Sequence, residues 1–310
     1  MKTIFAVVLL AVMSMWGVSC SKSDDAPDPV IPPVDSTEKT NVDVRGAITT
    51  NTTWTKNTVY RLRGYVYVTS GAVLKIEPGT KIVSNKDSAG VLVIYKGSKI
   101  DAEGTAADPI VFSSAETSPA PGDLGGVIIV GQAKGNTNHK VVEGGLDVAY
   151  NSFGGNSDDD NSGVLKYLRI EYGGKAVNPG DEVNGLSLYT VGSGTTIEYV
   201  QVLRGLDDAF EIFGGTVNLK HIIAYNNADD DFDFDDGYSG MIQFAVSIKD
   251  PQFSDAKGTG GDISNNFEFD NVNGSNGLPF ATTPITYPVM SNITTIGPNN
   301  APNTSADFGY

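Results

Sequence analysis

An internal repeat constrains the fold of this chain more than any other feature. The segments "AFEIFGGTVNLKHIIAY" (209–225) and "DFDFDDGYSGMIQFAVS" (231–247) align without a gap at an offset of 22 residues. The alignment pairs Phe210 with Phe232, Gly215 with Gly237, Leu219 with Met241, and Ile222 with Phe244. A repeat this short cannot bury its apolar residues alone, so successive copies are expected to stack on one shared core.

Further copies extend the pattern in both directions. Residues 185–203 align with two extra residues in the turn, and a looser copy is split between 266–271 and 289–297. Nearer the N-terminus, 64–76 matches 90–102 at an offset of 26. Imperfect repeats of this length, each with two or three short strands, are typical of a β-solenoid.

The local pattern agrees with an all-β fold. Short apolar runs are separated by Gly, Asn and Asp, and no amphipathic helix follows the N-terminal segment. A β-sandwich would also show many short strands, but it does not require a gapless self-alignment. The candidate strands are 65–68, 91–95, 109–112, 127–130 and 165–170.

The N-terminus resembles a bacterial lipoprotein signal. Lys2 precedes the apolar run "IFAVVLLAVMSMW", and "GVSC" ends at Cys20, the only cysteine. This run is short for a membrane span. The resemblance implies a signal peptide at 1–19 and a lipidated Cys20, although Gly17 stands where such signals usually have Leu. The alternative is an ordinary secretory signal with a chance cysteine.

Residues 20–41 predict a lipidated cysteine and a disordered, Pro-rich tether before a domain at 42–310. The "SKSDD" after Cys20 resembles the export tag of surface-displayed lipoproteins, so we expect an outer-membrane lipoprotein on the surface of a Gram-negative bacterium. The net charge of −16 repels nucleic acid and anionic lipid. We therefore expect no nucleic-acid partner, and membrane contact only through the lipid.

Several motifs resemble one family of surface proteins. They are "AVLKIEPGTKI" (72–82), "DPIVFSSA" (108–115), "GGVIIVGQA" (125–133), "LRIEYGG" (168–174) and the acidic stretch at 207–240. Over about 45–310 the chain resembles right-handed parallel β-helix lipoproteins of the pectate-lyase-like superfamily. The resemblance implies an all-β, right-handed parallel β-helix (β-solenoid) with irregular turn loops. Members mostly lack a known biochemical function and continue past this chain's end, which predicts a C-terminally truncated domain.

The acidic stretch "ADDDFDFDDGYSG" (228–240) is placed by the repeat. Strand alternation turns Phe232 and Phe234 towards the core, and turns Asp231, Asp233 and Asp235 to the opposite, solvent side. The repeat then sets acids of successive turns side by side. The resulting candidate metal ligands are Asp207, Asp208, Glu211, Asp229, Asp230, Asp231, Asp233, Asp235, Glu268 and Asp270.

Two explanations of these acids stay open. Residues 205–219 and 222–248 contain no Lys or Arg, so stacked carboxylates would repel unless a hard cation such as Ca²⁺ binds them. Alternatively, Asp and Asn cap turns by accepting hydrogen bonds from backbone N–H groups. A second acidic segment, "NSDDDNSG" (156–163), is expected to be a plain surface loop.

Evidence for catalysis is weak. The only histidines are His139, expected in a loop, and His221, which aligns with Tyr199 and Gln243 in a solvated strand position. A calcium-dependent polysaccharide lyase needs a base, for which Arg204 and Lys220 are the candidates. A glycosidase needs two carboxylates at suitable separation.

A non-catalytic role fits better. A rigid rod on a lipidated tether suits adhesion, structural display, or the binding of glycans or cell-surface proteins. The aromatic residues considered for sugar contact are Tyr172, Tyr189, Tyr225 and Tyr238, and for any single one of them core packing or turn filling is the favoured alternative.

Overall fold

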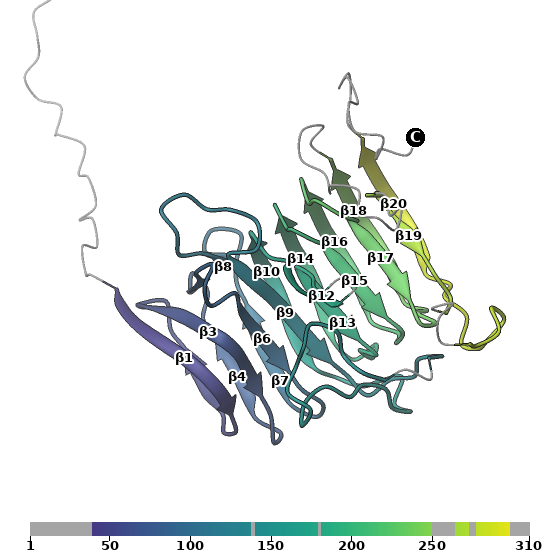
Figure 1. The fold of residues 1–310 in the computed structure, drawn as a ribbon, viewed down its shortest axis with the longest axis horizontal. Coiled ribbons are helices and arrows are strands. Elements are labelled where there is room, and N and C mark those ends of the chain that lie inside the picture. Colours follow the sequence, from purple (N-terminus) through teal and green to yellow (C-terminus); the bar gives the residue numbers. More distant parts are fainter. Residues whose placement is uncertain (1–38, 138–139, 179–180, 250–263, 273–276, 298–310) are drawn as a thin grey trace, which may run out of the picture. The chain divides into compact units, whose positions relative to one another are not determined.

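The computed structural model describes residues 39–137, 140–178, 181–249, 264–272 and 277–297. Here the chain forms stacked strands, and most of them pair in parallel with strands of the turns before and after them (Figure 1). None of the described segments forms a helix long and apolar enough to cross a bilayer.

The strands line three faces around one core, as in a right-handed parallel β-helix. We call each complete turn of this helix a rung. The first face contains β1 (Thr40–Ile48), the end of β3 (Thr58–Val68), β6 (Gly90–Ile94), β9 (Leu124–Val130), β13 (Leu186–Tyr189), β15 (Phe210–Phe213), β17 (Phe232–Asp235) and β19 (Glu268–Phe269).

The second and third faces merge along the chain. The second begins with β2 (Thr52–Trp54), β4 (Val73–Ile76) and β7 (Lys99–Glu103), and the third contains β5 (Lys81–Ser84) and β8 (Ile110–Ser114). From β10 onwards one strand serves both faces, because β10 pairs with β7 through its first half and with β8 through its second half. These strands are β10 (Gly163–Glu171), β14 (Thr196–Leu203), β16 (Asn218–Tyr225), β18 (Met241–Ile248) and β20 (Val289–Ile296).

The repeat is confirmed by the strand register. Phe210 pairs with Phe232 and Ile212 with Phe234, and all four side chains are fully buried. The Phe210 and Phe232 rings stack with centroids 5.2 Å apart. The 26-residue offset near the N-terminus is also confirmed, since it separates the partners in every β3–β6 and β4–β7 pair.

One part of the gapless alignment is wrong. Leu219 pairs with Ile242 rather than Met241, and Ile222 stacks on Ala245 rather than Phe244. The turn between β17 and β18 is one residue longer than the turn between β15 and β16, which shifts the register by one. Strand alternation then turns Met241 and Phe244 outwards, where they are exposed.

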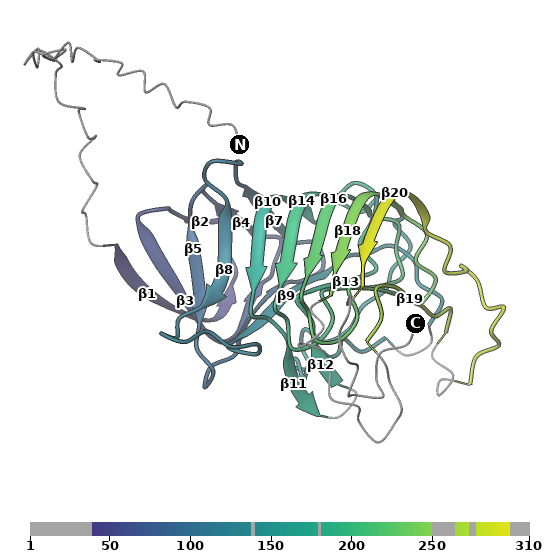
Figure 2. The ribbon, with the colours of Figure 1, turned by 90° about the horizontal axis from the view of Figure 1, so that it is seen from above.

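A second hydrophobic cluster lies outside the first face. We call residues 131–137, 140–162, 175–178 and 181–184 the outer layer. They include the antiparallel hairpin of β11 (Lys175–Asn178) and β12 (Asp181–Val183), which lies outside the row of stacked strands (Figure 2). Its apolar side chains pack against outward-facing residues of β3, β6, β9, β13 and β15. The outer layer contributes Val142, Leu146, Phe153 and Val183 to this cluster, and the first face contributes Tyr67, Val91, Val93, Ile128, Val130, Tyr189 and Phe213.

Candidate functional site

The predicted row of acids on the first face exists. Glu211 on β15 pairs in register with Asp233 on β17, which pairs with Glu268 on β19. Asp270 follows directly after β19, and its N–H donates a hydrogen bond to the carbonyl of Phe234 at 3.0 Å. The alternation of "FDFDD" therefore separates core phenylalanines from outward carboxylates, as expected.

The expectation that these carboxylates face solvent is wrong for most of them. Asp208, Glu211 and Asp230 are buried, Asp231 is 0% exposed, and Asp233 is half-buried. Alternation establishes only that the side chains leave the core; it does not establish what lies beyond the sheet. Only Asp270 at the C-terminal end of the row is exposed.

The outer layer covers part of the row directly. Asn184 donates a hydrogen bond from its amide to the Glu211 carboxylate. The Asn136 N–H donates to the Asp236 carbonyl at 2.8 Å, and the Thr137 side chain bonds the Asp236 carboxylate. Both Asn184 and Asn136 are themselves buried. These contacts place polar groups of the outer layer against the acids of β15 and of the turn after β17.

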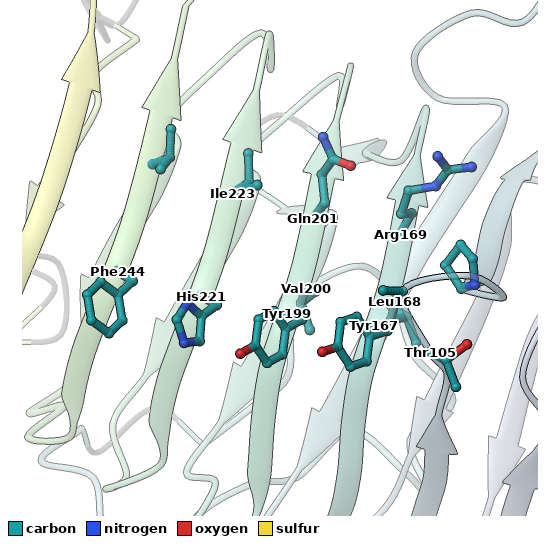
Figure 3. A pocket seen from close by; sticks show the side chains of 13 residues that line it. Thr105, Tyr167, Leu168, Arg169, Tyr199, Val200, Gln201, His221, Ile223 and Phe244 are labelled. Carbon is teal, nitrogen blue, oxygen red and sulfur yellow. The ribbon is translucent and has the colours of Figure 1, made fainter.

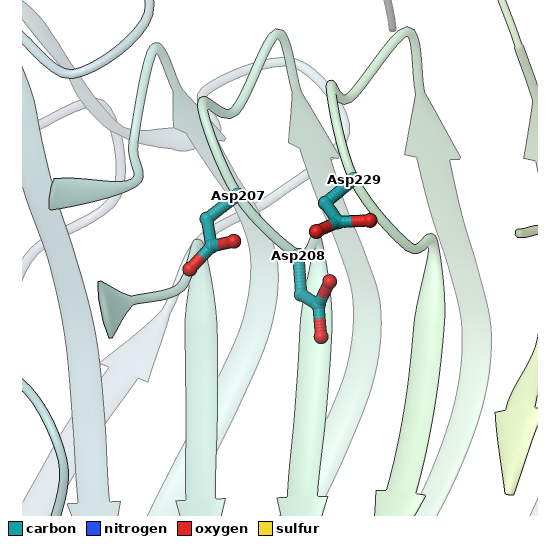
Figure 4. A group of neighbouring side chains, drawn as sticks. All are labelled: Asp207, Asp208 and Asp229. Atoms are coloured by element: carbon teal, nitrogen blue, oxygen red, sulfur yellow. The ribbon is translucent and has the colours of Figure 1, made fainter. Parts of the chain in front are cut away.

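Two carboxylate groupings have metal-ligand spacing. Asp207, Asp208 and Asp229 lie on two adjacent turns, and Figure 4 shows their carboxylates gathered between neighbouring strands; one oxygen from each lies within 4.8 Å of the others. Asp208, Glu211 and Asp233 form the second grouping at the same limit. Asp208 belongs to both, so the two form one continuous acidic pocket.

Turn capping also occurs here. The Asp208 Oδ1 accepts a hydrogen bond from the Asp230 N–H of the next turn at 2.9 Å. The Asn227 Oδ1 accepts from the Gly205 N–H at 2.8 Å, and the Asp230 carboxylate accepts from the Asn265 N–H. These bonds tie each turn to its neighbour, so the capping explanation is confirmed for these side chains.

Burial makes the pocket hard to ionise. Loss of hydration is the main cause in each case, and neighbouring carboxylates add to it. The pKa of Asp230 is raised to about 8, that of Asp233 to about 7 and that of Asp235 to about 9. The pKa values of Asp208 and Glu211 are raised well above the usual range, with Asp207 and Glu143 respectively the next contributors after burial.

A basic side chain, that of Lys249, pairs with the acidic stretch at Asp231, and the sequence did not predict this contact. Its Nζ lies 3.4 Å from Asp231 Oδ1, with the Lys249 side chain 3% exposed and the Asp231 side chain 0%. Burial still raises the pKa of Asp231 because desolvation outweighs the attraction of Lys249. The Ser247 hydroxyl also donates to the Asp231 carboxylate. Lys249 directly follows β18, just outside the segment 222–248 that contains no Lys or Arg.

Of the two candidate catalytic bases, Lys220 lies apart from the acidic pocket. Lys220 is on β16, in register with Glu198 and Gln243, and its Nζ lies 5.9 Å from the Phe244 ring centroid. Arg204 has a left-handed backbone (φ 52°), and its N–H donates to the Tyr225 carbonyl at 3.1 Å. The acids lie on β15, β17 and β19 and in the adjoining turns, and Arg204 lies in the same turn before β15 as Asp207 and Asp208.

The aromatic candidates divide into buried and accessible residues. Tyr189 and Tyr238 are buried, at 1% and 0% exposure, so neither can contact a sugar, and the core-packing alternative is confirmed for both. Tyr189 packs under the outer layer, and the Tyr238 hydroxyl donates to the Val217 carbonyl at 2.8 Å. Tyr225 is exposed and Tyr172 is half-buried.

His221 lies in a column of stacked rings that the sequence reading did not identify. Its ring centroid is 4.4 Å from that of Tyr199, as the alignment predicted, and 4.7 Å from that of Phe244. Phe244 rather than Gln243 is the neighbour because of the one-residue shift in β18. His139 lies outside the described residues.

The second acidic segment contributes to the outer layer. Asp158 pairs with Lys134 at 2.9 Å, and this contact lowers the pKa of Asp158. Asp160 accepts hydrogen bonds from Gln132 and Ser162, while Asp159 is exposed.

Comparison with known proteins agrees with this architecture. The family model described as a pectate-lyase like beta helix domain matches residues 46–307. Neither the curated proteins nor the solved structures include a match. The resemblance suggested by the sequence motifs and the three-faced helix therefore lead to the same conclusion: this chain belongs to the pectate-lyase-like β-helix domain family.

Proposed function

We propose that this protein is a non-catalytic, surface-displayed β-helix lipoprotein that binds glycans or cell-surface proteins, and that Ca²⁺ stabilises it at the acidic pocket. One observation carries the calcium proposal: Asp233 Oδ1 and Asp235 Oδ1 are buried and have no hydrogen-bond partner. A buried carboxylate oxygen without a partner is costly, and a bound cation would remove that cost.

The donor set fits a hard cation. Every side chain in the two metal-spaced groupings is a carboxylate, and Ca²⁺ prefers oxygen ligands. Asp207, Asp208 and Asp229, or Asp208, Glu211 and Asp233, would supply three ligand atoms, and backbone carbonyls or water would complete the coordination. The bound cation would supply positive charge to the pocket.

Burial favours a structural role for this pocket over a catalytic one. A glycosidase needs carboxylates that a substrate can reach, yet Asp208 and Glu211 are only 9% and 8% exposed. A lyase needs a base beside the bound uronate, and Lys220 lies on β16 over the Phe244 ring. The proposal therefore places binding elsewhere on the molecule and assigns the pocket to stability.

Thermal unfolding in EDTA and in millimolar Ca²⁺ tests the proposal. At a Ca²⁺ concentration about 100 times the Kd, binding to the folded state adds about 2.7 kcal/mol. Asp233→Asn should raise the Tm in EDTA, because one like charge is removed, and should reduce the Ca²⁺-induced shift. Asp159→Asn, at an exposed position of the acidic loop, is the matched control and should change neither.

Two outcomes would contradict the calcium proposal. One is an unchanged Tm in millimolar Ca²⁺. The other is a lower Tm for Asp233→Asn in EDTA, with the Ca²⁺ response intact, because that result assigns Asp233 to turn capping alone.

A further inference from the structure

A groove crosses the outside of the helix where the second and third faces meet. It has a volume of about 480 Å³ and is lined by residues of β10, β14, β16 and β18, and by the loop between β7 and β8. Figure 3 shows two rows of side chains along it. Tyr167, Tyr199, His221 and Phe244 form one row, which we call the aromatic column, and Arg169, Gln201 and Ile223 form part of the other.

The aromatic column occupies strained positions. Tyr167, Tyr199, His221 and Phe244 all have left-handed backbones, with φ between 49° and 59°. The bend between the two faces requires this conformation, but it does not require an aromatic side chain. The equivalent residue on β20 is Asn292, a type that tolerates positive φ more readily. Four ring-bearing residues at a bend that disfavours them point to a role beyond turning the chain.

Within the column, stacking covers the ring faces of the two inner members, Tyr199 and His221, and leaves their edges free. Successive ring centroids are 4.5, 4.4 and 4.7 Å apart, so Tyr199 and His221 each have a ring on both sides. The hydroxyls of Tyr167 and Tyr199 lie on the same side of the row (Figure 3). With the Gln201 amide and the Thr105 hydroxyl, the groove combines hydrogen-bond donors and acceptors with apolar edges.

The strand pairing argues against an extended peptide bound by backbone hydrogen bonds. β10, β14, β16 and β18 are each paired on both sides, so the groove contains no free strand edge. A ligand here must be recognised through side chains alone.

The charges favour an uncharged ligand. The lining contains no Asp or Glu, and its cation Arg169 already pairs with Glu171 at 3.2 Å. Beside the groove, Lys166 lies 3.7 Å from Glu198 and 3.9 Å from Glu103. A polyanion would therefore find compensated cations, neighbouring carboxylates and a net charge of −16.

From these observations we infer that the groove beside the aromatic column binds a neutral glycan chain lying across β10, β14, β16 and β18. Sugar hydroxyls both donate and accept hydrogen bonds, which matches the mixed polar groups, and sugar C–H groups match Ile223, Val246 and the ring edges. This inference rests on the proposed function as a binding module and assigns its site and ligand class.

An array of neutral and acidic oligosaccharides, followed by calorimetry with the neutral β-glucan, β-xylan or β-mannan that gives the strongest signal, tests the inference. Gln201→Ala removes a polar contact without touching the column, and Ile223→Arg fills the groove. We expect each to weaken binding about tenfold or more. Met241→Ala is the matched control on β18: Met241 is an exposed apolar residue, like Phe244, but does not line the groove, so affinity should not change.

Failure of the groove assignment and failure of the proposed glycan-binding function give different results in these experiments. If no oligosaccharide binds to the folded protein, both the groove assignment and glycan binding fail. If a glycan binds with unchanged affinity to Gln201→Ala and Ile223→Arg, or if only acidic glycans bind, the groove inference alone fails. Unchanged Tm values for the variants would show that any loss of binding is not a loss of fold.

Discussion

Phe232 and Asp233 are adjacent in the sequence, yet their environments differ completely. Phe232 stacks in the apolar core, whereas Asp233 lies on the other side of the same strand, among carboxylates and under partial cover. The pKa of Asp233 is about 7 because burial penalises its charged form and Asp230 adds repulsion. The protonation state of a single residue therefore depends on the layer that covers the strand.

We predict that the cation-free protein loses stability as pH rises. In the unfolded chain Asp ionises near the ordinary value of 3.8, whereas the folded protein holds protons on Asp233 and Asp236 to about 7 and on Asp230 to about 8. Between these limits the folded state binds more protons than the unfolded state, so stability is greatest at low pH and falls towards pH 8. Each such group contributes at most about 1.4 kcal/mol per pH unit.

Urea unfolding in EDTA between about pH 5 and pH 8.5 measures this dependence. Stability that rises with pH across the window would contradict the raised pKa values. Millimolar Ca²⁺ should flatten the slope, because it favours the ionised carboxylates.

The sequence predicted the direction of a side chain correctly where strand alternation alone determines it. The inward positions of Phe210, Phe232 and Phe234 followed from alternation and the repeat. Lys249 was missed because its pairing with Asp231 depends on β18 lying beside the acidic turn, and no pattern within the strand records that contact. The bends at Tyr167 and His221 were also missed, since a left-handed residue inside an apolar strand has no sequence signature unless it is Gly or Asn.

Among the elements, the outer layer has the largest effect on the candidate site, because it covers carboxylates that were expected to face solvent. Its two segments enter between β9 and β10 and between β10 and β13 without disturbing the stack, because Leu186 on β13 still pairs with Val127 on β9. Its described residues form one short hairpin and one isolated bridge. Apolar side chains make most of its contacts with the first face. The repeat could not predict it, because residues 131–162 have no counterpart in other rungs.

We predict that Phe153→Ala loosens the outer layer while the helix remains folded. Phe153 is 4% exposed and packs on Tyr189 and Phe213, with ring centroids 5.0 and 6.4 Å away. Truncation of a buried Phe costs about 3–5 kcal/mol. Hydrogen exchange should accelerate in residues 140–155 but not in β14 or β16. Val148→Ala, at a highly exposed position of the same layer, is the control and should exchange like the parent protein. Uniformly faster exchange throughout the chain would show that the layer and the helix unfold as one unit.

At the scale of the whole molecule, the repeat predicted the architecture well. Offsets of 22 and 26 residues placed successive strands in parallel register, and a one-residue difference in the turn before β18 accounts for the misassigned pairs. The proposed lipid anchor belongs to residues outside the described range, and its support comes from the sequence around Cys20.

We predict that Cys20→Ser releases the protein from membranes. Without the thiol no lipid can be attached, and the acidic β-helix has little attraction for anionic lipid. Cell fractionation with immunoblotting measures this, and Ser21→Ala is the control that should stay in the membrane fraction. Retention of Cys20→Ser in membranes would contradict lipid anchoring.

Parallel stacking also determines how the molecule would respond to mechanical load. Each rung is hydrogen-bonded only to its neighbours, and β1 is bonded to β3 alone among the described strands. A pull transmitted through the residues that precede Lys39 would load this terminal pair first. The ladder would then unzip rung by rung from its N-terminal end, and it would soon meet β3 and β6, where the packing of the outer layer on Tyr67, Val91 and Val93 adds resistance.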